Sequence, residues 1–369
     1  MKSSKYRPSK IVVDLEAIRY NVKEEIKRLP KETDLFAVVK ADGYGHGALE
    51  VAKAALEVGA KGLCVSNLDE AVELREAGIT QPILVLSYVS LEFLEVAVAN
   101  NITLTATSLE WIKQLNDRLD KKITIHLKID SGMGRVGIID LEEMREAKTI
   151  LQTNPYIDFE GIFTHFSKAD SQDDSYLNLQ KERFSSALKV FGETVKYIHT
   201  ANSATALWHD AWESNLVRFG DAMYGMNPSG KELKTPYSLK QALTLETEII
   251  HIKQLAKGEK IGYGATYETK SKEWIATLPI GYADGFRRDF QGFEVLVEGQ
   301  KVPVVGRVCM DQCMIKLSSK LPVGTKVIIF GDSQGQFNSI QTGAEYIQTI
   351  NYEITCGLTE RLPRNYVNK

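Results

Sequence analysis

The sequence has few of the features that mark secreted, membrane-spanning or nucleic-acid-binding proteins. Its cysteines are too few among 369 residues for a disulfide framework, which favours reduced thiols and a cytoplasmic location. The basic N-terminal residues lack the apolar stretch of a signal peptide, and no apolar run approaches the ~20 residues of a spanning helix. A net charge of −3 provides no basic field for nucleic acid or an anionic membrane. Cys309 and Cys313 have no second Cys or His pair at zinc-like spacing, so we expect no metal site.

The first part of the chain alternates short apolar runs with segments whose apolar residues lie three and four positions apart. The apolar runs, which predict strands, are Leu35–Val39, Gly62–Val65, Ile83–Leu86, Ile102–Thr105, Ile123–Ile129, Phe159–Thr164, Tyr197–Thr200 and Leu216–Phe219. The helical segments include Ala48–Val58, Asp69–Ala77, Leu91–Ala99 and Leu177–Phe191. About eight strands with crossover helices predict an α/β fold of the (β/α)8 TIM-barrel type. An open doubly wound sheet is the alternative, weakened because no G-x-G-x-x-G follows the first strand.

The pattern changes near Thr235-Pro236 to β-rich segments separated by turns. These segments are Leu243–Ile252, Trp274–Pro279, Phe293–Val297, Lys301–Val308, Met314–Leu317 and Lys326–Phe330, with one helical stretch at Ser339–Gln348. We therefore expect a barrel domain over residues 10–236 and a smaller, mainly antiparallel β-domain over residues 237–369. Residues 1–9 are candidates for packing on the second domain. Ile11–Leu15 predicts a strand ahead of the barrel, and Asp14 a cap for a helix from about Leu15 to Arg28.

Polar and ionisable side chains follow the predicted barrel strands. In a parallel barrel the reactive groups gather at the C-terminal ends of the strands. They are Lys40 after the first strand; Lys128, Asp130 and Arg135 after the fifth; His165 after the sixth; Asn202 and Ser203 after the seventh; and Arg218 and Gly220 after the eighth. Packing alone does not readily explain such a set, which predicts an active site at this end of the barrel.

Lys40 directly follows a buried-looking strand and precedes a glycine-rich loop. A desolvated lysine has a lowered pKa, which frees its amine to attack a carbonyl group. Glycines flank Tyr44 and would let the backbone approach a ligand, and the tyrosine hydroxyl can donate to a phosphate. The alternatives are a lysine that extends from a strand end to solvent, and a simple turn with an incidental tyrosine.

The segments after strands seven and eight could bind a phosphate group through amides, a hydroxyl and a glycine. Ser203 and Gly220 lie there, and Asp221 could contribute only its backbone, because its carboxylate would repel phosphate. Arg218 cannot accept a proton from a pyridine nitrogen, so a pyridoxal phosphate ring beside it would stay neutral. A neutral ring withdraws electrons more weakly, which favours removal and return of a proton at the Cα of a bound amino acid with few side reactions. The alternative is an arginine that pairs with a barrel carboxylate.

Two further features complete the candidate site. Arg135 could bind a carboxylate bidentately, while Lys128 nearby would be repelled unless its charge were removed or balanced. In the β-domain, Tyr263 lies between two glycines and could act as a second acid or base, because racemisation needs two such groups on opposite faces of a planar carbanion. The alternative for Tyr263 is an ordinary loop aromatic.

Together these segments closely resemble the alanine racemases, a pyridoxal phosphate family of fold type III, from about Arg7 to Arg364. The most specific matches are Val38–Gly47, Leu127–Gly137, Thr164–Phe166, Ala201–Ser203, Val217–Gly225, Gly262–Tyr267, Pro279–Gly285, Gly306–Met314 and Asn351-Tyr352-Glu353. The resemblance implies an isomerase that interconverts L-alanine and D-alanine for peptidoglycan synthesis in the cell wall. It also implies a homodimer with shared active sites.

The resemblance implies roles for individual residues. The two bases would be Lys40, which also carries the cofactor as a Schiff base, and Tyr263, which comes from the other subunit. His165 matches the histidine that supports this tyrosine and Arg218. Phosphate-contacting positions are matched by Tyr44, Ser203, Gly220, Asp221 and Tyr352. Arg135 and Met310 match substrate-binding positions, and Lys128 matches a lysine that is carbamylated in many members. Residues that line the entryway to the cofactor are matched by Asp170, Tyr282, Arg288 and Arg307.

The sequence departs from the family pattern at Asp42-Gly43, where many members have Asn-Ala, and at Asp221, a position that varies. Two other functions are alternatives to this one. A fold-type-III decarboxylase would need a carboxylate near the pyridine nitrogen, where this chain has Arg218. A non-catalytic pyridoxal phosphate carrier would usually lack the β-domain that contains Tyr263.

Overall fold

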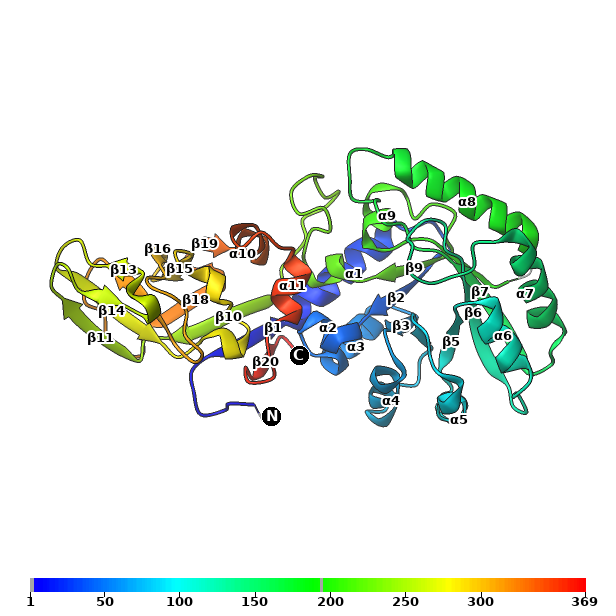
Figure 1. The fold of residues 1–369 in the computed structure, drawn as a ribbon, viewed down its shortest axis with the longest axis horizontal. Helices are drawn as coiled ribbons and strands as arrows, with labels where there is room; N and C mark the ends of the chain where they lie inside the picture. Colours follow the sequence, from blue (N-terminus) through cyan, green and yellow to red (C-terminus); the bar gives the residue numbers. More distant parts are fainter. Residues whose placement is uncertain (1–2, 193–194) are drawn as a thin grey trace. The chain divides into compact units, whose positions relative to one another are not determined.

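The computed structural model describes residues 3–192 and 195–369, and the chain forms two compact units (Figure 1). One unit comprises Ile18–Gly43 and Ala48–Leu239. The other comprises the N-terminal residues up to Ala17, the short segment Tyr44–Gly47 and Lys240–Lys369. Among the helices of the described residues, none is long and apolar enough to cross a membrane.

The first unit is the expected parallel barrel. Its strands, in sequence order, are β2 (Asp34–Val38), β3 (Gly62–Val65), β4 (Ile83–Val85), β5 (Thr103–Ala106), β6 (Ile123–Lys128), β7 (Ile157–Phe163), β8 (Tyr197–His199) and β9 (Leu216–Phe219). Each pairs in parallel with its neighbour from β2 to β8, and β9 pairs with β2. Between β8 and β9 the Asn215 amide donates to the Ile198 carbonyl at 3.1 Å, which nearly closes the barrel. The barrel prediction is confirmed, and the open-sheet alternative is wrong.

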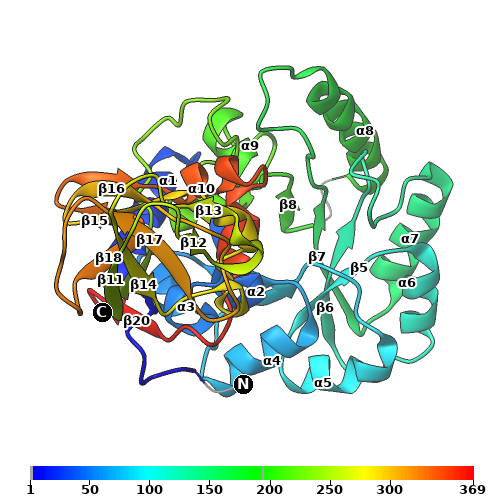
Figure 2. The same cartoon turned by 60° about the vertical axis from the view of Figure 1, so that its left-hand side comes forward.

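Helices follow most of the strands and lie on the outer side of the barrel (Figure 2). The helical elements are α1 (Leu15–Arg28), α2 (Lys40–Tyr44), α3 (Ala48–Glu57), α4 (Leu68–Glu76), η1 (Leu91–Phe93), α5 (Leu94–Ala99), α6 (Leu109–Asn116), α7 (Leu141–Thr153), α8 (Ser175–Phe191), α9 (Ser203–Trp208) and η2 (Asp221–Tyr224). Side chains cap several N-termini: Asn67, Ser108 and Asp140 accept from amides in α4, α6 and α7. The four predicted helical segments are confirmed, one of them divided into η1 and α5.

The second unit is built from antiparallel sheets, as predicted. Its strands are β1 (Lys10–Asp14), β10 (Leu243–Glu248), β11 (His251–Leu255), β12 (Lys260–Ile261), β13 (Tyr267–Glu268), β14 (Glu273–Leu278), β15 (Glu294–Val297), β16 (Gln300–Pro303), β17 (Cys313–Leu317), β18 (Lys326–Ser333), β19 (Gln336–Asn338) and β20 (Arg364–Val367). The largest sheet has the order β16-β15-β18-β10-β1-β20, with β19 on β18. A second sheet has the order β11-β14-β17. Among these described strands, the β1–β20 pair is parallel and the others are antiparallel.

The strand predicted at Ile11–Leu15 is β1, and α1 begins directly after it. The Asp14 carboxylate accepts the Glu16 amide at 2.9 Å, as expected for a residue that caps this helix. Because β1 pairs with β10 and β20, this segment belongs to the sheet of the second unit.

Two sequence predictions for the second unit were wrong in detail, and one helix was missed. The single strand Leu243–Ile252 is two strands in different sheets: at the junction the Ile249 amide donates to Thr325, whereas the Ile250 amide donates to Thr277. The strand Lys301–Val308 ends early, at Pro303. The short helix α11 (Asn351–Cys356), which follows α10 (Ile340–Tyr346), was not predicted. Continuous β-propensity through the first segment gives no sign of a change of sheet.

Candidate active site

Lys40 lies two residues beyond the end of β2, at the start of a left-handed turn. Ala41, Asp42 and Tyr44 have φ values of 52°, 51° and 53°, and Gly43 has a φ of 60°. Non-glycine residues rarely adopt this conformation, and each costs on the order of 1–3 kcal/mol. Such strain clusters at functional sites, which supports the assignment of Lys40 to the site.

Side chains from distant parts of the barrel hold this turn in place. The Glu70 carboxylate accepts the amides of Ala41 and Ser66, both at 2.7 Å. The Tyr224 hydroxyl donates to the Val38 carbonyl at 2.9 Å, at the end of β2. Sequence reasoning did not identify Glu70 or Tyr224, because neither lies in a motif or at a predicted strand end.

Arg218 lies inside the barrel on β9 and is 3% exposed. Its Nη1 donates to the His199 carbonyl at 2.9 Å and to His199 Nδ1 at 2.8 Å. Its Nη2 donates to the Thr164 carbonyl at 2.8 Å and the Thr200 carbonyl at 3.2 Å. Within residues 3–192 and 195–369 no carboxylate pairs with it, so the alternative of a structural ion pair is wrong. The Nε–H of Arg218 has no hydrogen-bond partner among the same residues and is available to a ligand.

The electrostatic surroundings of Arg218 are strongly positive. Burial lowers the pKa of Arg218 to about 10, so it is still a cation at neutral pH. Burial and the charge of Arg218 hold the pKa of His165 well below its ordinary value, so this histidine is neutral. His165 Nδ1 lies 3.4 Å from Arg218 Nη2, and its Nε2 lies 3.4 Å from the Asn202 amide nitrogen. An anionic ligand would relieve this concentration of positive charge.

The segments after β8 and β9 converge, as the sequence suggested. The Ser203 hydroxyl accepts the Gly220 amide at 2.9 Å, which joins the start of α9 to the end of β9. Asp221 follows as a buried residue and opens η2. A hydroxyl and backbone amides therefore meet at the C-terminal end of the barrel, in the neighbourhood where phosphate groups bind in such barrels.

Lys128 and Asp130 lie at the end of β6, and both are buried. Burial, followed by the charge of Arg218, lowers the pKa of Lys128 to about 7. Arg135 was expected to be the main repelling cation, but it contributes less than Arg218. The structure thus places Lys128 where its ammonium form is disfavoured.

Asp130 organises the loop that carries Arg135. Its carboxylate accepts the amides of Gly132, Gly134 and Arg135 at 2.9–3.0 Å. Burial would raise the pKa of Asp130, but these amides and Lys128 lower it below its ordinary value. The Arg135 side chain is exposed, and among the described residues its guanidinium has no hydrogen-bond partner. It is therefore available to bind a carboxylate.

In the second unit, Tyr263 opens η3 (Tyr263–Ala265) and is 68% exposed. It lines an open pocket of about 460 Å³ together with residues of β11, β14 and β17, among them Met314. The turn packs near Arg307, whose backbone lies 3.3 Å from where a side chain on Gly262 would begin. An exposed aromatic side chain at the edge of a pocket is suited to contact another surface.

Met310 and Tyr282 lie on adjoining loops of the second unit. The Ala283 amide donates to the Met310 carbonyl at 3.0 Å, and both Met310 and Tyr282 are exposed. The loops approach so closely that a Cβ on Gly281 would lie 2.4 Å from the Met310 carbonyl oxygen. Glycine is thus required at position 281.

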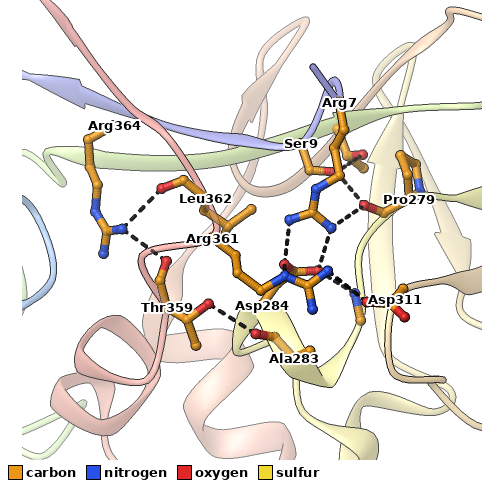
Figure 3. A network of polar contacts seen from close by, with 12 residues as sticks. Arg7, Ser9, Pro279, Ala283, Asp284, Asp311, Thr359, Arg361, Leu362 and Arg364 are labelled. Atoms are coloured by element: carbon orange, nitrogen blue, oxygen red, sulfur yellow. Dashed lines mark hydrogen bonds and ion pairs between the residues drawn. The ribbon is translucent and has the colours of Figure 1, made fainter. Parts of the chain in front are cut away.

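A buried carboxylate supports these two loops (Figure 3). Asp284, in η4 (Tyr282–Asp284), is fully buried. Its carboxylate accepts hydrogen bonds from both terminal nitrogens of the Arg7 guanidinium. Arg361 bridges Asp284 at 3.3 Å and Asp311 at 2.6 Å. The network joins the N-terminal segment to the loops that carry Tyr282 and Met310. Sequence reasoning did not identify it.

Tyr44 and Tyr352, two proposed phosphate contacts, lie together within the second unit. Their ring centroids are 6.0 Å apart. Tyr44 is buried and Tyr352, in α11, is half-buried. The structure thus brings together two hydroxyl-bearing rings from segments more than three hundred residues apart.

The remaining predicted residues are divided between the units. Asp170, in the barrel unit, is half-buried, and burial raises the pKa of its carboxyl group. Arg288, in η5 (Arg288–Phe290), and Arg307 are exposed in the second unit. In the part of the chain that the structure describes, no cluster of three or more His, Cys, Asp or Glu side chains could hold a metal ion.

An eight-stranded barrel with reactive groups at the C-terminal strand ends, followed by an antiparallel β-unit, defines a class of barrel enzyme. Residues 13–228 match the family described as alanine racemase, N-terminal domain, and residues 242–366 match alanine racemase, C-terminal domain. The chain belongs to the alanine racemase family, whose members are isomerases.

Individual relatives agree with this assignment. The alanine racemase of Pediococcus pentosaceus is 49% identical over 362 residues, covering 98% of this chain and 97% of that protein. The alanine racemase structure from E. faecalis has a TM-score of 0.98 at 49% identity, covering 99% of this chain and 100% of that one. The structure of the Bacillus anthracis alanine racemase with bound L-Ala-P has a TM-score of 0.94 at 45% identity, covering 99% and 96%. A histidine racemase from Leuconostoc mesenteroides has a TM-score of 0.92 at 29% identity over the full length of both chains.

Proposed function

We propose that this protein is an alanine racemase that interconverts L-alanine and D-alanine with pyridoxal phosphate as cofactor. The observation that carries the proposal is Arg218, a cation held by backbone carbonyls with its Nε–H available beside the site. A pyridine nitrogen can accept a hydrogen bond from this N–H group. Because arginine does not give up its proton, the pyridine nitrogen stays unprotonated. The D-alanine formed would supply peptidoglycan synthesis.

The barrel residues fit the cofactor. Lys40 supplies the amine, and the Ser203 hydroxyl, which accepts the Gly220 amide, keeps its own proton to donate to a phosphate. Gly220 is assigned to the phosphate from the family motifs. Asp221 contributes its backbone, and Tyr44 and Tyr352 are assigned to the phosphate from the family motifs. When bound, pyridoxal phosphate supplies an electron-withdrawing group that acidifies the Cα–H of the amino acid. The positive surroundings of Arg218 and His165 favour an anionic ligand.

Proton transfer at Cα is assigned to two groups on opposite faces, Lys40 and Tyr263. One removes the proton and the other returns one, which inverts the configuration. We infer that Tyr263 and Met310 serve a site in a second copy of the chain, because both project from the second unit with more than half of their surface exposed. The protein would then act as a homodimer with shared sites.

The substrate carboxylate is assigned to Arg135, whose exposed guanidinium is carried on the loop fixed by Asp130, and to Met310. Carbamylation of Lys128 would turn a repelling cation into an anion between Arg218 and Arg135. A neutral amine is the form that reacts with carbon dioxide, and a pKa of about 7 provides it. The entryway assignments of Asp170, Tyr282, Arg288 and Arg307 rest on the family motifs alone.

The test of the proposal is a mixing experiment with two inactive variants, Lys40→Ala and Tyr263→Phe. The purified protein with added pyridoxal phosphate should show cofactor absorbance and abolish the optical rotation of L-alanine. Each variant alone should be inactive. After subunits are exchanged between the variants, one site in each mixed dimer regains both groups, so about one quarter of wild-type activity should return.

Three results would count against parts of the proposal. An unchanged rotation with cofactor bound would exclude alanine racemase activity. Decarboxylation of lysine or arginine, measured as released carbon dioxide, would favour the decarboxylase instead. Activity that stays absent after subunit exchange, verified by mass spectrometry of mixed dimers, would place Tyr263 outside a shared site.

A further inference from the structure

A continuous chain of hydrogen bonds crosses the barrel interior beneath Arg218. Arg218 Nη1 lies 2.8 Å from His199 Nδ1, and His199 Nε2 lies 2.8 Å from His126 Nδ1. His126 Nε2 lies 3.1 Å from a carboxylate oxygen of Glu160. The other oxygen of Glu160 accepts the Lys196 ammonium at 3.0 Å. The chain therefore runs from the candidate site to an exposed lysine that precedes β8.

The two ends of this chain determine its direction. A guanidinium can only donate, so His199 Nδ1 must be the unprotonated acceptor and His199 carries its proton on Nε2. That proton is donated to His126 Nδ1, so His126 carries its own proton on Nε2. A carboxylate can only accept, so this last proton is donated to Glu160. Every hydrogen bond in the chain is satisfied in one direction and in no other.

The charge state of each member agrees with this direction. Burial lowers the pKa of both His126 and His199, so each ring is neutral and has one N–H. The hydrogen bond from His126 and the contact with Lys196 lower the pKa of Glu160 despite its burial, so it is an ionised acceptor. The His199 ring is further fixed by stacking on Phe163, with ring centroids 4.5 Å apart and planes 7° apart.

Glu160 is partly buried and contacts the buried His126 ring from an irregularity in β7. Ile125 pairs with Phe159 and the next residue, His126, pairs with Gly161, so Glu160 is the extra residue of a β-bulge. Phe159 faces outward, where its ring packs on Phe191 of α8, and beyond the bulge Phe163 lies against His199.

Gly161 opens the space that the His126 ring occupies. A Cβ at position 161 would lie 2.6 Å from His126 Nδ1, closer than real Cβ atoms come to such a neighbour. The bulge and the glycine together allow the Glu160 carboxylate to contact the His126 imidazole. The His126 and His199 rings are fully buried, so a ring nitrogen left without a partner there would be costly.

We propose that Glu160 is a positioning residue that sets the tautomers of His126 and His199 and thereby holds Arg218 in the orientation the cofactor needs. Reversal of the chain would turn His199 Nδ1–H against the Arg218 N–H groups. Arg218 would then lose one of the acceptors that hold it, and its Nε–H would lose its fixed direction. The predicted effect on the cofactor rests on the proposed function, whereas the predicted histidine tautomers are independent of it.

Histidine tautomers can be read directly by nuclear magnetic resonance of protein labelled with nitrogen-15 histidine, because protonated and unprotonated ring nitrogens have well-separated shifts. The chain has only six histidines, so substitution of single histidines by asparagine assigns the signals. We expect His126 and His199 of the wild-type protein to be protonated on Nε2 alone at pH 7 to pH 8. A proton on Nδ1 of either ring would overturn the proposal, whatever the enzyme activity.

Two substitutions of similar size separate the roles of Glu160. Glu160→Gln retains a carbonyl acceptor for His126 and loses the charge, with the exposed Lys196 free to turn to solvent. Glu160→Met removes the acceptor. We expect single Nε2–H tautomers in Glu160→Gln, and a fraction of His126 protonated on Nδ1 in Glu160→Met.

The same variants connect the tautomers to catalysis. With cofactor bound, we expect kcat for alanine to fall about tenfold in Glu160→Met, with KM changed less than about twofold, and to recover largely in Glu160→Gln. Lys196→Met is the control and should change neither the tautomers nor kcat. A Glu160→Met protein with wild-type tautomers would overturn the proposal. Altered tautomers with an unchanged kcat would overturn the link to Arg218 and leave the racemase assignment intact.

Discussion

Lys128 provides the most direct test of the electrostatics of the barrel. It is 2% exposed, and burial together with Arg218 lowers the pKa of its amine from 10.5 to about 7. In the unfolded chain the amine regains its ordinary pKa. Lys128→Met replaces the amine with an apolar side chain of similar length and removes this titration.

The sign and size of the effect follow from proton linkage. Between pH 7 and pH 10.5 the unfolded chain holds a proton on Lys128 that the folded chain has lost, so the free energy of unfolding rises with pH. The rise approaches about 1.4 kcal/mol per pH unit, because one pKa unit corresponds to that energy. Between pH 7.5 and pH 9.5 the wild type should therefore gain roughly 2.5 kcal/mol relative to Lys128→Met.

The assay is reversible urea unfolding of both proteins in buffers depleted of carbon dioxide, at constant ionic strength. The quantity to plot against pH is the free energy of unfolding of the wild type minus that of Lys128→Met. All other titrating groups are present in both proteins, so their contributions cancel. Addition of bicarbonate at pH 7.5 should then stabilise the wild type alone, as the neutral amine is converted to a carbamate beside two arginines. Mass spectrometry under mild conditions should detect the added carbon dioxide.

A difference that stays flat from pH 7.5 to pH 9.5 would refute a lowered pKa for Lys128. If the difference in unfolding free energy rises with pH but does not respond to bicarbonate, Lys128 has a lowered pKa and does not form a carbamate. These outcomes are separate because the first depends on burial and the second on reaction with carbon dioxide.

Two further predictions concern the loops of the second unit. In Gly281→Ala the new Cβ would lie 2.4 Å from the Met310 carbonyl oxygen, so we expect a loss of roughly 2 kcal/mol in thermal unfolding and a raised KM for alanine. Retention of both wild-type values would show that the loop can relax at little cost. Asp284→Asn leaves Arg7 without its buried carboxylate and should cost roughly 3 kcal/mol, whereas the exposed Asp311→Asn should cost less than about 1 kcal/mol. Equal losses in these last two variants would contradict the buried-network interpretation.

The sequence predicted the barrel well because its strands are covered on both faces. Runs such as Gly62–Val65 are buried at every position, so they are apolar throughout and stand out from the amphipathic helices. The second unit was harder to predict. At Ile249 and Ile250 the chain passes from one sheet to another within two residues, and this change depends on partners at Thr325 and Thr277.

The candidate site shows the same division. The residues at strand ends could be found from the sequence, because topology alone places Lys40 and Arg218 at one end of the barrel. Their supports could not be found. Glu70, in the first turn of a helix, accepts the Ala41 amide. Glu160, the extra residue of a bulge, contacts the His126 ring. Neither a hydrogen-bond partner nor a bulge leaves a periodic pattern in the sequence.

Fold and substrate are specified by different parts of such a chain. The histidine racemase with a TM-score of 0.92 shares the full architecture at 29% identity, so the barrel and β-unit alone do not select an amino acid. What the two folds hold in common is a frame that can position acid, base and cofactor groups at the strand ends. In this chain that frame includes the hydrogen-bonded path from Arg218 to Glu160. We therefore expect selection of the substrate side chain to come from the exposed loops that carry Tyr282 and Met310, which rest on supports such as Gly281 and Asp284.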